Sequence, residues 1–343
     1  MLRLLRLPTL LLAAVVATGA LRPAARLLDI YWIDVEGGAS TLVVTAQGQS
    51  FLMDTGYAGP ADRDAARIEQ VVRREAGLDR LDFVLTSHFH GDHVGGLASL
   101  AARLPVGTFV DHGDSIEQQT DAGRALWAQY LAVAGTKRRV VRPGDRLPLS
   151  GAQVTVVASD GRTLAAPLDR ATPNPSCSAF VRQPDDTGEN GRSLGYHLRV
   201  GAFDFLDLGD LSWNFQQRLV CPDNLLGLVD LAQAPHHAVR DDVLPQLLAA
   251  VRPGVVVMNN GPTKGGGAVA VAAVLASPGL EDAWSLHRVI ANDAVHNAAE
   301  PLTANIGTTD GCAGHWIRAR LTDDGIYALT NSRNKHSKTY RVR

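Results

Sequence analysis

Along this chain, short runs of apolar residues alternate with segments in which apolar residues recur every three or four positions. Short apolar runs bounded by Gly, Asp, Asn or Pro turns predict β-strands. We expect strands at residues 28–35, 40–45, 50–53, 81–86, 106–110, 193–200, 202–208, 228–234 and 254–258, with further short strands within 140–157. The pairs 40–45 with 50–53 and 193–200 with 202–208 each enclose a glycine turn and predict hairpins.

Helical spacing separates these strands. Ala65, Ile68, Val71 and Val72 recur at intervals of three and four and predict a helix over residues 64–76. Similar patterns predict helices at residues 97–104, 115–134, 243–251 and 265–276, and one ending at 215–220. Residues 159–192 are rich in Asp, Pro, Gly, Asn and Ser, and predict a long surface loop, either close to a functional site or mobile.

The order of these elements predicts an α/β fold. Strands paired in hairpins, with helices between them, suit two mixed β-sheets flanked by helix layers. The chain shows no internal repeat and no linker that would separate two independent domains. We therefore expect a single domain over residues 21–343.

Residues 1–20 have the pattern of a signal peptide. Arg3 and Arg6 precede an apolar run, and Thr18-Gly19-Ala20 supplies the small residues of a cleavage site. This pattern predicts export across a bacterial inner membrane and a periplasmic or secreted protein. The alternative is an uncleaved anchor helix, although the run is shorter than the ~20 apolar residues of a typical span. No other stretch is apolar enough to cross a membrane.

Composition narrows the classes of protein. Hydrophobic residues make up 45% of the 343 residues, too many for a disordered chain. The net charge of −2 argues against holding nucleic acid by bulk charge, although a local basic patch is still compatible with it. Three cysteines are too few for a disulfide-rich scaffold or a four-thiolate zinc site. In an oxidising compartment we expect Cys177 and Cys312, both in loops, to pair and Cys221 to be free.

The strongest chemical signal follows the predicted strand at residues 81–86. His88, His90, Asp92 and His93 lie within six residues of one another. Imidazole and carboxylate groups suit zinc, iron or manganese. In a turn after a strand, the imidazoles at positions i and i+2 can face one ion and the next two ligands a second ion. Solvated or hydrogen-bonded polar residues are the weaker interpretation of this spacing.

The motif His-x-His-x-Asp-His resembles the signature of the metallo-β-lactamase-fold hydrolases. Residues 51–56 resemble the family's strand ending in a bracing Asp, here Asp54. Residues 205–210 resemble the strand whose final Asp bridges two metals, here Asp210, and residues 234–237 resemble the segment that supplies the last His. The resemblance covers residues 30–260 and implies the αββα sandwich, with a C-terminal extension after about residue 260.

Within that superfamily, the chain resembles the extracytoplasmic hydrolase domain of the competence protein ComEC. This resemblance rests on residues 33–40, on residues 190–193 and on the double histidine, His236-His237. Ala238-Val239 follows the double histidine here, where ComEC has Gly-Ser. The membrane channel that accompanies the ComEC domain is absent from this sequence, so DNA uptake is not implied.

The superfamily resemblance implies two ligand sets. The first ion would take His88, His90 and Asp210, with Asn190 as a weak candidate at the position where most members have a third His. The second ion would take Asp92, His93, Asp210 and one of His236 and His237. His197 could substitute for the missing histidine, but the favoured interpretation is that His197 is a core or edge residue and not a ligand. The implied cofactor is Zn²⁺, as one or two ions, with Mn²⁺ or Fe as alternatives.

Other polar segments are weaker candidates. Asn260 and Lys264 lie in a glycine-rich loop after a predicted strand and could hold an anionic part of a substrate. An ordinary flexible loop is the competing interpretation. His287 and His296 could also reach the cleft. Residues 331–343 carry Arg and Lys without any acid; we expect a solvated basic tail, with a phosphate-contacting patch as the alternative.

These observations predict an exported metal-dependent hydrolase that uses a metal-activated water. Asp92 would orient the nucleophile and pass a proton to the leaving group. The ComEC-like features favour a phosphodiester or nucleic-acid-type substrate. The alternatives are a β-lactam, lactone or other ester or amide hydrolase acting on a small molecule, and a metal-binding protein without turnover.

Overall fold

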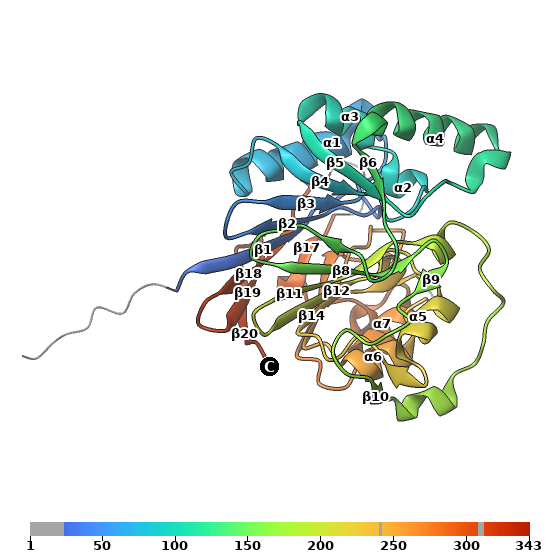
Figure 1. Cartoon of the computed structure of the whole chain (residues 1–343). Helices are drawn as coiled ribbons and strands as arrows, with labels where there is room; N and C mark the ends of the chain where they lie inside the picture. Colours follow the sequence, from blue (N-terminus) through green and yellow to red (C-terminus); the bar gives the residue numbers. More distant parts are fainter. Residues whose placement is uncertain (1–23, 240–241, 308–311) are drawn as a thin grey trace, which may run out of the picture.

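The computed structural model describes residues 24–239, 242–307 and 312–343. The predicted signal peptide, residues 1–20, lies outside these residues. Two nine-stranded sheets pack face to face, and helices cover both outer faces (Figure 1). The predicted αββα sandwich with two mixed sheets is therefore confirmed.

The first sheet has the strand order β20-β19-β18-β1-β2-β3-β4-β5-β6. Its strands are β1 (Arg26–Trp32), β2 (Thr41–Thr45), β3 (Ser50–Met53), β4 (Leu81–Leu85), β5 (Val106–Asp111), β6 (Arg138–Val140), β18 (Ile317–Thr322), β19 (Ile326–Asn331) and β20 (Ser337–Arg341). Its outer face is covered by α1 (Arg63–Gln70), which continues as a π-helical turn η2 (Val71–Glu75), and by α2 (Gly91–Val94), α3 (Leu97–Arg103) and α4 (Asp121–Ala134). Shorter 3-10 turns on this side are η1 (Pro60–Asp62), η3 (Glu117–Gln119) and η4 (Gly135–Lys137).

The second sheet has the order β17-β16-β15-β14-β12-β11-β8-β7, with β9 paired to β8. Its strands are β7 (Arg146–Leu147), β8 (Gln153–Ser159), β9 (Arg162–Thr163), β11 (Gly195–Val200), β12 (Phe203–Asp207), β14 (Leu231–Gln233), β15 (Val255–Met258), β16 (Asp282–His287) and β17 (Thr303–Asn305). It is covered by α5 (Trp213–Val220), α6 (Pro245–Val251) and α7 (Ala268–Leu275). A separate ribbon joins β10 (Thr172–Pro173) and β13 (Asp223–Asn224). The remaining 3-10 turns are η5 (Pro175–Ala179), η6 (Asn190–Arg192), η7 (Pro235–Ala238), η8 (Ala294–His296) and η9 (Glu300–Leu302).

Alternating side chains of the strands build the layers. In β1, Ile30 and Trp32 point into the core between the sheets, while Tyr31 joins the cluster beneath the helices. The other central strands follow the same period of two, since successive side chains of a strand face opposite sides of the sheet. Both faces of the first sheet are therefore buried at β1, β2 and β3, which explains why these strands are nearly continuous hydrophobic runs in the sequence.

Parallel pairing brings several strand ends to one edge. β3 and β4 run parallel with Met53 opposite Leu85, and β12, β14 and β15 run parallel in the second sheet. The loops that follow these strands leave the sandwich on the same side. Residues after the carboxyl ends of parallel strands are the usual place for a binding site in such sheets.

The C-terminal part of the chain differs from the prediction. Residues 331–343 are not a solvated tail, because β20 pairs with β19 and extends the first sheet. Tyr340 is buried, accepts a hydrogen bond from Trp284 Nε1 at 2.9 Å and donates one to Asp282 Oδ2 at 2.7 Å. The segment after residue 260, predicted as an extension, supplies β16 and β17 to one sheet and β18, β19 and β20 to the other.

The predicted Cys177–Cys312 disulfide is wrong. Cys177 pairs with Cys221, with the two Cα atoms 5.7 Å apart, and Cys312 is a free thiol. The reason is the ribbon of β10 and β13, which brings η5 beside the end of α5. Loop composition alone does not reveal that pairing.

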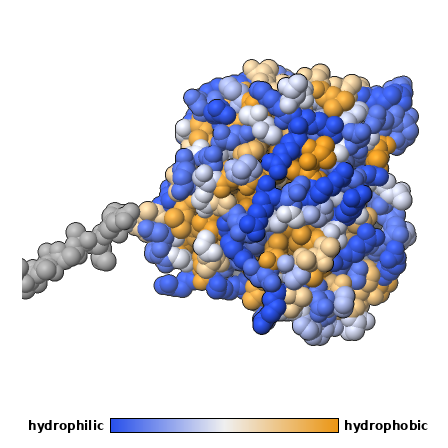
Figure 2. Space-filling model, viewed as in Figure 1, coloured by the Kyte–Doolittle hydropathy of each residue, from blue (hydrophilic) through white to orange (hydrophobic). Residues whose placement is uncertain are grey.

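On the face shown in Figure 2, hydrophilic residues are interspersed with small apolar areas. Among the residues that the structure describes, no helix combines the length and the apolarity needed to span a membrane.

Candidate metal centre

The predicted ligand residues meet at the shared edge of the two sheets. His88, His90, Asp92 and His93 follow β4 and continue into α2. Asp210 follows β12, the double histidine lies in η7 after β14, and Asn190 opens η6. Residues from both sheets therefore face one another across the edge of the sandwich.

Asp210 lies at the centre of this cluster. Its Oδ2 atom faces imidazole Nε2 atoms at 3.1 Å for His93, 3.3 Å for His237, 3.5 Å for His236 and 3.9 Å for His88. Asp210 is 3% exposed, and His88, His93 and His237 are fully buried, so this convergence is shielded from bulk water. A buried carboxylate among several imidazoles is the arrangement expected of a metal-bridging ligand.

The two rings from the loop after β4 are held from behind. His93 Nδ1 lies 2.8 Å from Asp54 Oδ2, and His88 Nδ1 lies 3.0 Å from Ser87 Oγ. Ser87 Oγ in turn donates to Asp54 Oδ2 at 2.6 Å, and the Ser87 amide donates to Asp54 Oδ1 at 2.7 Å. A hydrogen bond at Nδ1 leaves the Nε2 lone pair of each ring directed at the cluster.

The rings of the double histidine are held in the same way. His236 Nδ1 pairs with Asp242, and His237 Nδ1 donates to the Asn259 carbonyl oxygen at 3.2 Å. Both histidines have positive φ angles, 49° and 52°, which non-glycine residues rarely adopt. This backbone turns both Nε2 atoms towards Asp210. Such conformations concentrate at functional sites, where the surrounding structure maintains them.

One donor set in this cluster corresponds to the second predicted ligand set. Asp92, His93, Asp210 and His237 form a group whose ligand atoms all lie within 4.8 Å of one another. Asp92 Oδ2 is 3.2 Å from His93 Nε2 and 3.4 Å from His237 Nε2. His237 is thus the member of the double histidine that accompanies the second predicted ligand set.

His236 lies beside the residues of the first predicted ligand set, a set to which the sequence alone did not assign it. His88 Nε2 lies 2.9 Å from His90 Nδ1 and faces Asp210, while His236 approaches Asp210 from the same cluster. Asn190 Nδ2 is 3.4 Å from His236 Nε2, and Asn190 Oδ1 is a buried oxygen that no described residue bonds. The imidazole of His236 and the amide of Asn190 therefore lie together at the place where most superfamily members would have the third histidine of the first ligand set. An orphaned buried oxygen beside clustered nitrogen donors fits a cation.

The charges of the cluster also fit a cation. Burial, and then His93, hold the pKa of His88 well below its ordinary value. Burial opposes ionisation of Asp210, but His237 and His93 outweigh it and keep the pKa of this carboxyl well below its usual range. Burial would also lower the pKa of His93, yet Asp210 and Asp92 raise it well above normal. A cation entering the cluster would therefore replace protons between ionised carboxylates.

The two residues predicted to bind substrate, Lys264 and Asn260, lie in different surroundings. Lys264 is half-buried beside the cluster and its Nζ forms an ion pair with Asp92. Asn260 does not reach the cleft, so that prediction is wrong. Its side chain is fully buried, donates to the His287 carbonyl at 2.9 Å and accepts from Ser285 Oγ at 2.6 Å. The amide fixes the loop that carries Lys264 and has no polar atom free for a substrate.

The remaining histidine candidates lie elsewhere. His197 sits in β11 with Nε2 3.2 Å from Asp204 Oδ1, as a buried histidine outside the cluster. His296 pairs with Asp293 at 2.7 Å near the surface. His287 ends β16 and contacts Asp34 at 2.6 Å, in a separate polar cluster.

Glu189 has a role that the sequence did not indicate. It precedes Asn190 and is fully buried; its Oε2 accepts from the Phe89 amide at 3.0 Å and from His112 Nε2 at 3.0 Å. It thereby anchors the loop between His88 and His90. The only sequence signal for this role was the position of Glu189 next to Asn190. That signal is weak, because the surrounding loop contains many other acidic residues.

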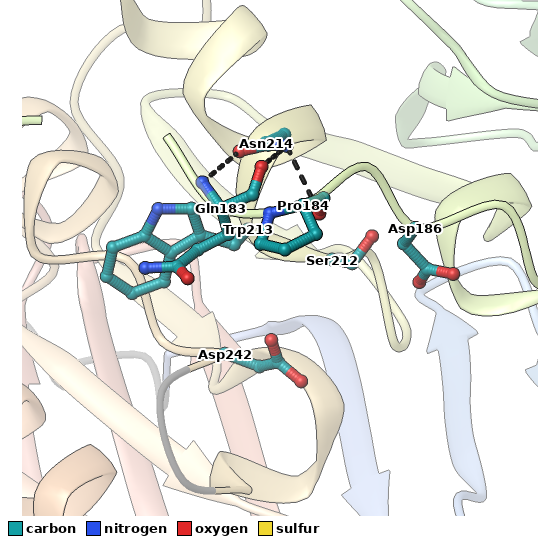
Figure 3. Close-up of a pocket in the computed structure, with 7 residues that line it drawn as sticks. All are labelled: Gln183, Pro184, Asp186, Ser212, Trp213, Asn214 and Asp242. Carbon is teal, nitrogen blue, oxygen red and sulfur yellow. Dashed lines mark hydrogen bonds between the residues drawn. The ribbon is translucent and has the colours of Figure 1, made fainter. Parts of the chain in front are cut away.

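Two cavities adjoin the centre. One, of about 240 Å³, is lined by residues of the long loop 159–192, by the start of α5 and by Asp242 (Figure 3). Asp242 also pairs with His236 Nδ1. The loop predicted from composition therefore does lie beside the site. The other, of about 450 Å³, is lined by His236, Lys264 and apolar side chains such as Val239 and Val289. This cavity combines the ammonium group of Lys264 with apolar side chains, and it lies next to the cluster because His236 lines it.

Residues 33–181 match the model of the metallo-beta-lactamase superfamily. The chain thus contains a domain of this superfamily, which confirms the wider of the two resemblances seen in the sequence. The match covers the strand that ends at Asp54 and the whole loop from His88 to His93.

Three curated proteins illustrate the similarity. A coenzyme F420H(2) oxidase of Methanothermobacter thermautotrophicus is 33% identical over 30% of this chain and 24% of its own length. A hydroxyacylglutathione hydrolase of Acidiphilium cryptum is 34% identical over 40% of this chain and 43% of its own. A UPF0173 metal-dependent hydrolase of Cupriavidus taiwanensis is 24% identical over 58% and 62%. The chain spans less than half the length of the first two relatives.

The geometry of the double histidine gives a first test. We expect His236→Ala and His237→Ala each to lower the metal content measured after dialysis by one equivalent, because each ring serves a different donor set. The matched control is His296→Ala, which removes an imidazole near the surface and should leave metal content unchanged. Loss of metal from only one of the two variants would contradict the assignment of both rings.

Proposed function

We propose that this protein is a metal-dependent hydrolase whose reaction takes place at the cluster around Asp210. The observation that carries the proposal is the orientation of the imidazoles. His88, His93, His236 and His237 all have Nδ1 engaged by a fixed partner and Nε2 turned towards Asp210. This arrangement leaves the nitrogen lone pairs for a cation.

A divalent cation held here would supply Lewis acidity and a water nucleophile activated at neutral pH. The chain's own residues then have distinct tasks. Asp210 and the four imidazoles fix the position of the reacting groups. Asp92 lies at the rim of the cluster, 13% exposed at its side chain, where it can orient a nucleophile and move a proton to the leaving group. Asp54 keeps the His93 ring in one orientation.

Lys264 indicates the charge of the substrate. Its Nζ pairs with Asp92, and it also lines the larger cavity. When Asp92 is engaged by a cation, the ammonium group becomes free to bind an anionic oxygen of a substrate in the cavity. We therefore favour a substrate with a negative charge close to the bond that is cleaved.

Within this class we propose a phosphodiester. The support comes from the ammonium group of Lys264 and from the motifs at residues 33–40 and 190–193 that resemble the ComEC hydrolase domain. A lactone, β-lactam or other ester carrying a carboxylate is the alternative, because the apolar wall of the cavity at Val239 and Val289 suits a compact organic group.

We further propose that the protein is exported. The sequence pattern of residues 1–20 supports this, and so does the Cys177–Cys221 disulfide, since such bonds persist mainly in oxidising compartments. Fractionation of a bacterial host followed by N-terminal sequencing would test it. A chain starting near residue 21 in the periplasm or medium is expected, and a full-length cytoplasmic chain would contradict it.

The activity is tested on protein freed of metal and then reloaded with Zn²⁺, Mn²⁺ or Fe²⁺. Each form is incubated with bis(p-nitrophenyl) phosphate, single-stranded DNA, a lactone and nitrocefin. Metal-dependent release of p-nitrophenol supports the phosphodiester proposal, and cleavage of nitrocefin or the lactone alone would replace it with the alternative. Stoichiometric metal without cleavage of any substrate would indicate a binding protein.

The role of Lys264 has its own test. We expect Lys264→Met to raise KM for an anionic substrate by about 10- to 100-fold, since a hydrogen bond to a charged group contributes about 1.5–3 kcal/mol. KM for a neutral ester, if one is cleaved, should change little. Lys338→Met, on β20, is the matched control. An equal effect on neutral and anionic substrates would contradict an anion-binding role.

A further inference from the structure

A second polar cluster, separate from the cluster around Asp210, includes residues of the loop that follows β1. Asp34 and Glu36 come from this loop, His287 ends β16, and Cys312 precedes β18. The ligand atoms of these four residues all lie within 4.8 Å of one another. They are up to 278 positions apart along the chain, so only the fold brings them together.

The contacts within this cluster are direct. Cys312 Sγ lies 3.0 Å from Asp34 Oδ2 and 2.9 Å from Glu36 Oε1. His287 Nε2 lies 2.6 Å from Asp34 Oδ1 and 3.9 Å from Glu36 Oε2. Arg67 Nη1 donates to Asp34 Oδ2 at 3.0 Å and to Glu36 Oε1 at 3.1 Å. A thiol, an imidazole and two carboxylates thus surround one point.

One oxygen in this cluster has no partner. The Glu36 side chain is 7% exposed, and its Oε2 atom, which faces His287, is bonded by no residue that the structure describes. A buried carboxylate oxygen without a donor is unfavourable unless a cation or a water satisfies it. Among the described residues, Arg67 is the arginine that pairs with both carboxylates, and its contacts leave Oε2 free.

Charge balance favours a divalent cation. The two carboxylates of Asp34 and Glu36 face one guanidinium, that of Arg67, so these three side chains leave a net charge of −1 in a buried place. With the thiol as thiolate, three anionic ligands and Arg67 leave −2, which a divalent cation neutralises. Thiolate, imidazole and two carboxylate oxygens also make up a four-ligand set of the kind that zinc accepts.

We propose that Asp34, Glu36, His287 and Cys312 form a separate zinc-type site with a structural role. On binding, the Cys312 thiol releases its proton to solvent and the sulfur donates its electron pair to the cation, with no change of oxidation state. The site is distinct from the cluster around Asp210 and does not depend on the proposed hydrolysis.

The proposed site connects to the first cluster through the loop after Glu36. Gly38 packs so closely on the segment after β4 that a Cβ atom there would lie 2.4 Å from the Asp92 carbonyl oxygen. The Ala39 amide donates to the same oxygen at 3.1 Å. A cation that fixes Asp34 and Glu36 would therefore also fix the backbone on which Asp92 rests.

Cobalt substitution tests the proposal without measuring activity. Thiolate bound to Co²⁺ gives a near-ultraviolet charge-transfer absorption, and Cys312 is the one free thiol among the described cysteines. The full chain reloaded with Co²⁺ should show this absorption, and Cys312→Ala should lose it together with one equivalent of metal. The matched pair is His287→Ala, which should lose one equivalent, and His296→Ala, which should lose none.

If a variant fails to fold, the cobalt spectrum of the wild-type protein alone still tests the proposed site. Cobalt saturation without the charge-transfer absorption would overturn the proposal, as would an unchanged metal count in folded Cys312→Ala. Loss of metal from His237→Ala with the charge-transfer absorption retained would support two independent sites, whether or not the protein hydrolyses any substrate.

Discussion

Asp92→Asn is expected to reduce hydrolysis by about 10²- to 10⁴-fold or more, which is the range for losing a positioned acid–base group. The carboxylate lies 3.2 Å from His93 Nε2 and 3.4 Å from His237 Nε2, so its charge also helps to hold a cation. The amide keeps the shape of the side chain but loses both the charge and the ability to transfer a proton. Turnover under saturating substrate measures the effect.

Two controls separate chemistry from folding in this variant. Asp114→Asn removes an exposed carboxylate, 77% accessible at its side chain, and should retain full activity. The circular dichroism spectrum of Asp92→Asn should match that of the wild-type protein, because the amide keeps the shape of the side chain. Wild-type turnover in pure, metal-loaded Asp92→Asn would show that another residue carries the proton.

The second large effect is expected from Asp54→Ala. Asp54 is 1% exposed and accepts from the Ser87 amide, from Ser87 Oγ and from His93 Nδ1. Removing it leaves buried donors without an acceptor, which costs about 1–3 kcal/mol for each donor. It also frees the His93 ring, and loss of such a supporting partner lowers metal affinity by about 10- to 100-fold.

Urea unfolding of the metal-free protein measures the first part of this effect and competition with a chelator measures the second. Asp54→Asn is the informative comparison, because it keeps one acceptor oxygen and tolerates the positive φ of 65° at this position. It should be less destabilised than Asp54→Ala. An unchanged unfolding midpoint in metal-free Asp54→Ala would contradict the bracing role.

The sequence predicted the cluster after β4 because those ligands are neighbours in the chain. A buried strand followed by a tight turn fixes the place of His88, His90, Asp92 and His93 almost by itself. Asp210 also follows a recognisable strand. Local spacing is sufficient for such residues, since the strand sets the direction from which each side chain approaches.

Other parts of the site depended on contacts between distant segments. The choice between His236 and His237 as the partner of Asp92 is decided by the 3.4 Å distance from His237 Nε2 to Asp92 Oδ2, which does not follow from residue type. The disulfide partner of Cys177 was set by a short ribbon rather than by loop composition. Asn260 has the residue type of a ligand-binding amide, but tertiary packing turned it inward against β16.

The position of β1 has a consequence for how the chain reaches this fold. β1 lies between β2 and β18, and Ile30 is opposite Ala319. Until residues 317–322 have been synthesised, one edge of β1 has no partner, and pairing across so long a separation is slow. The first sheet can therefore be completed only after nearly the whole chain is available. Late closure of this kind is compatible with crossing a membrane unfolded, and a chain cut before β18 would expose an apolar strand edge prone to aggregation.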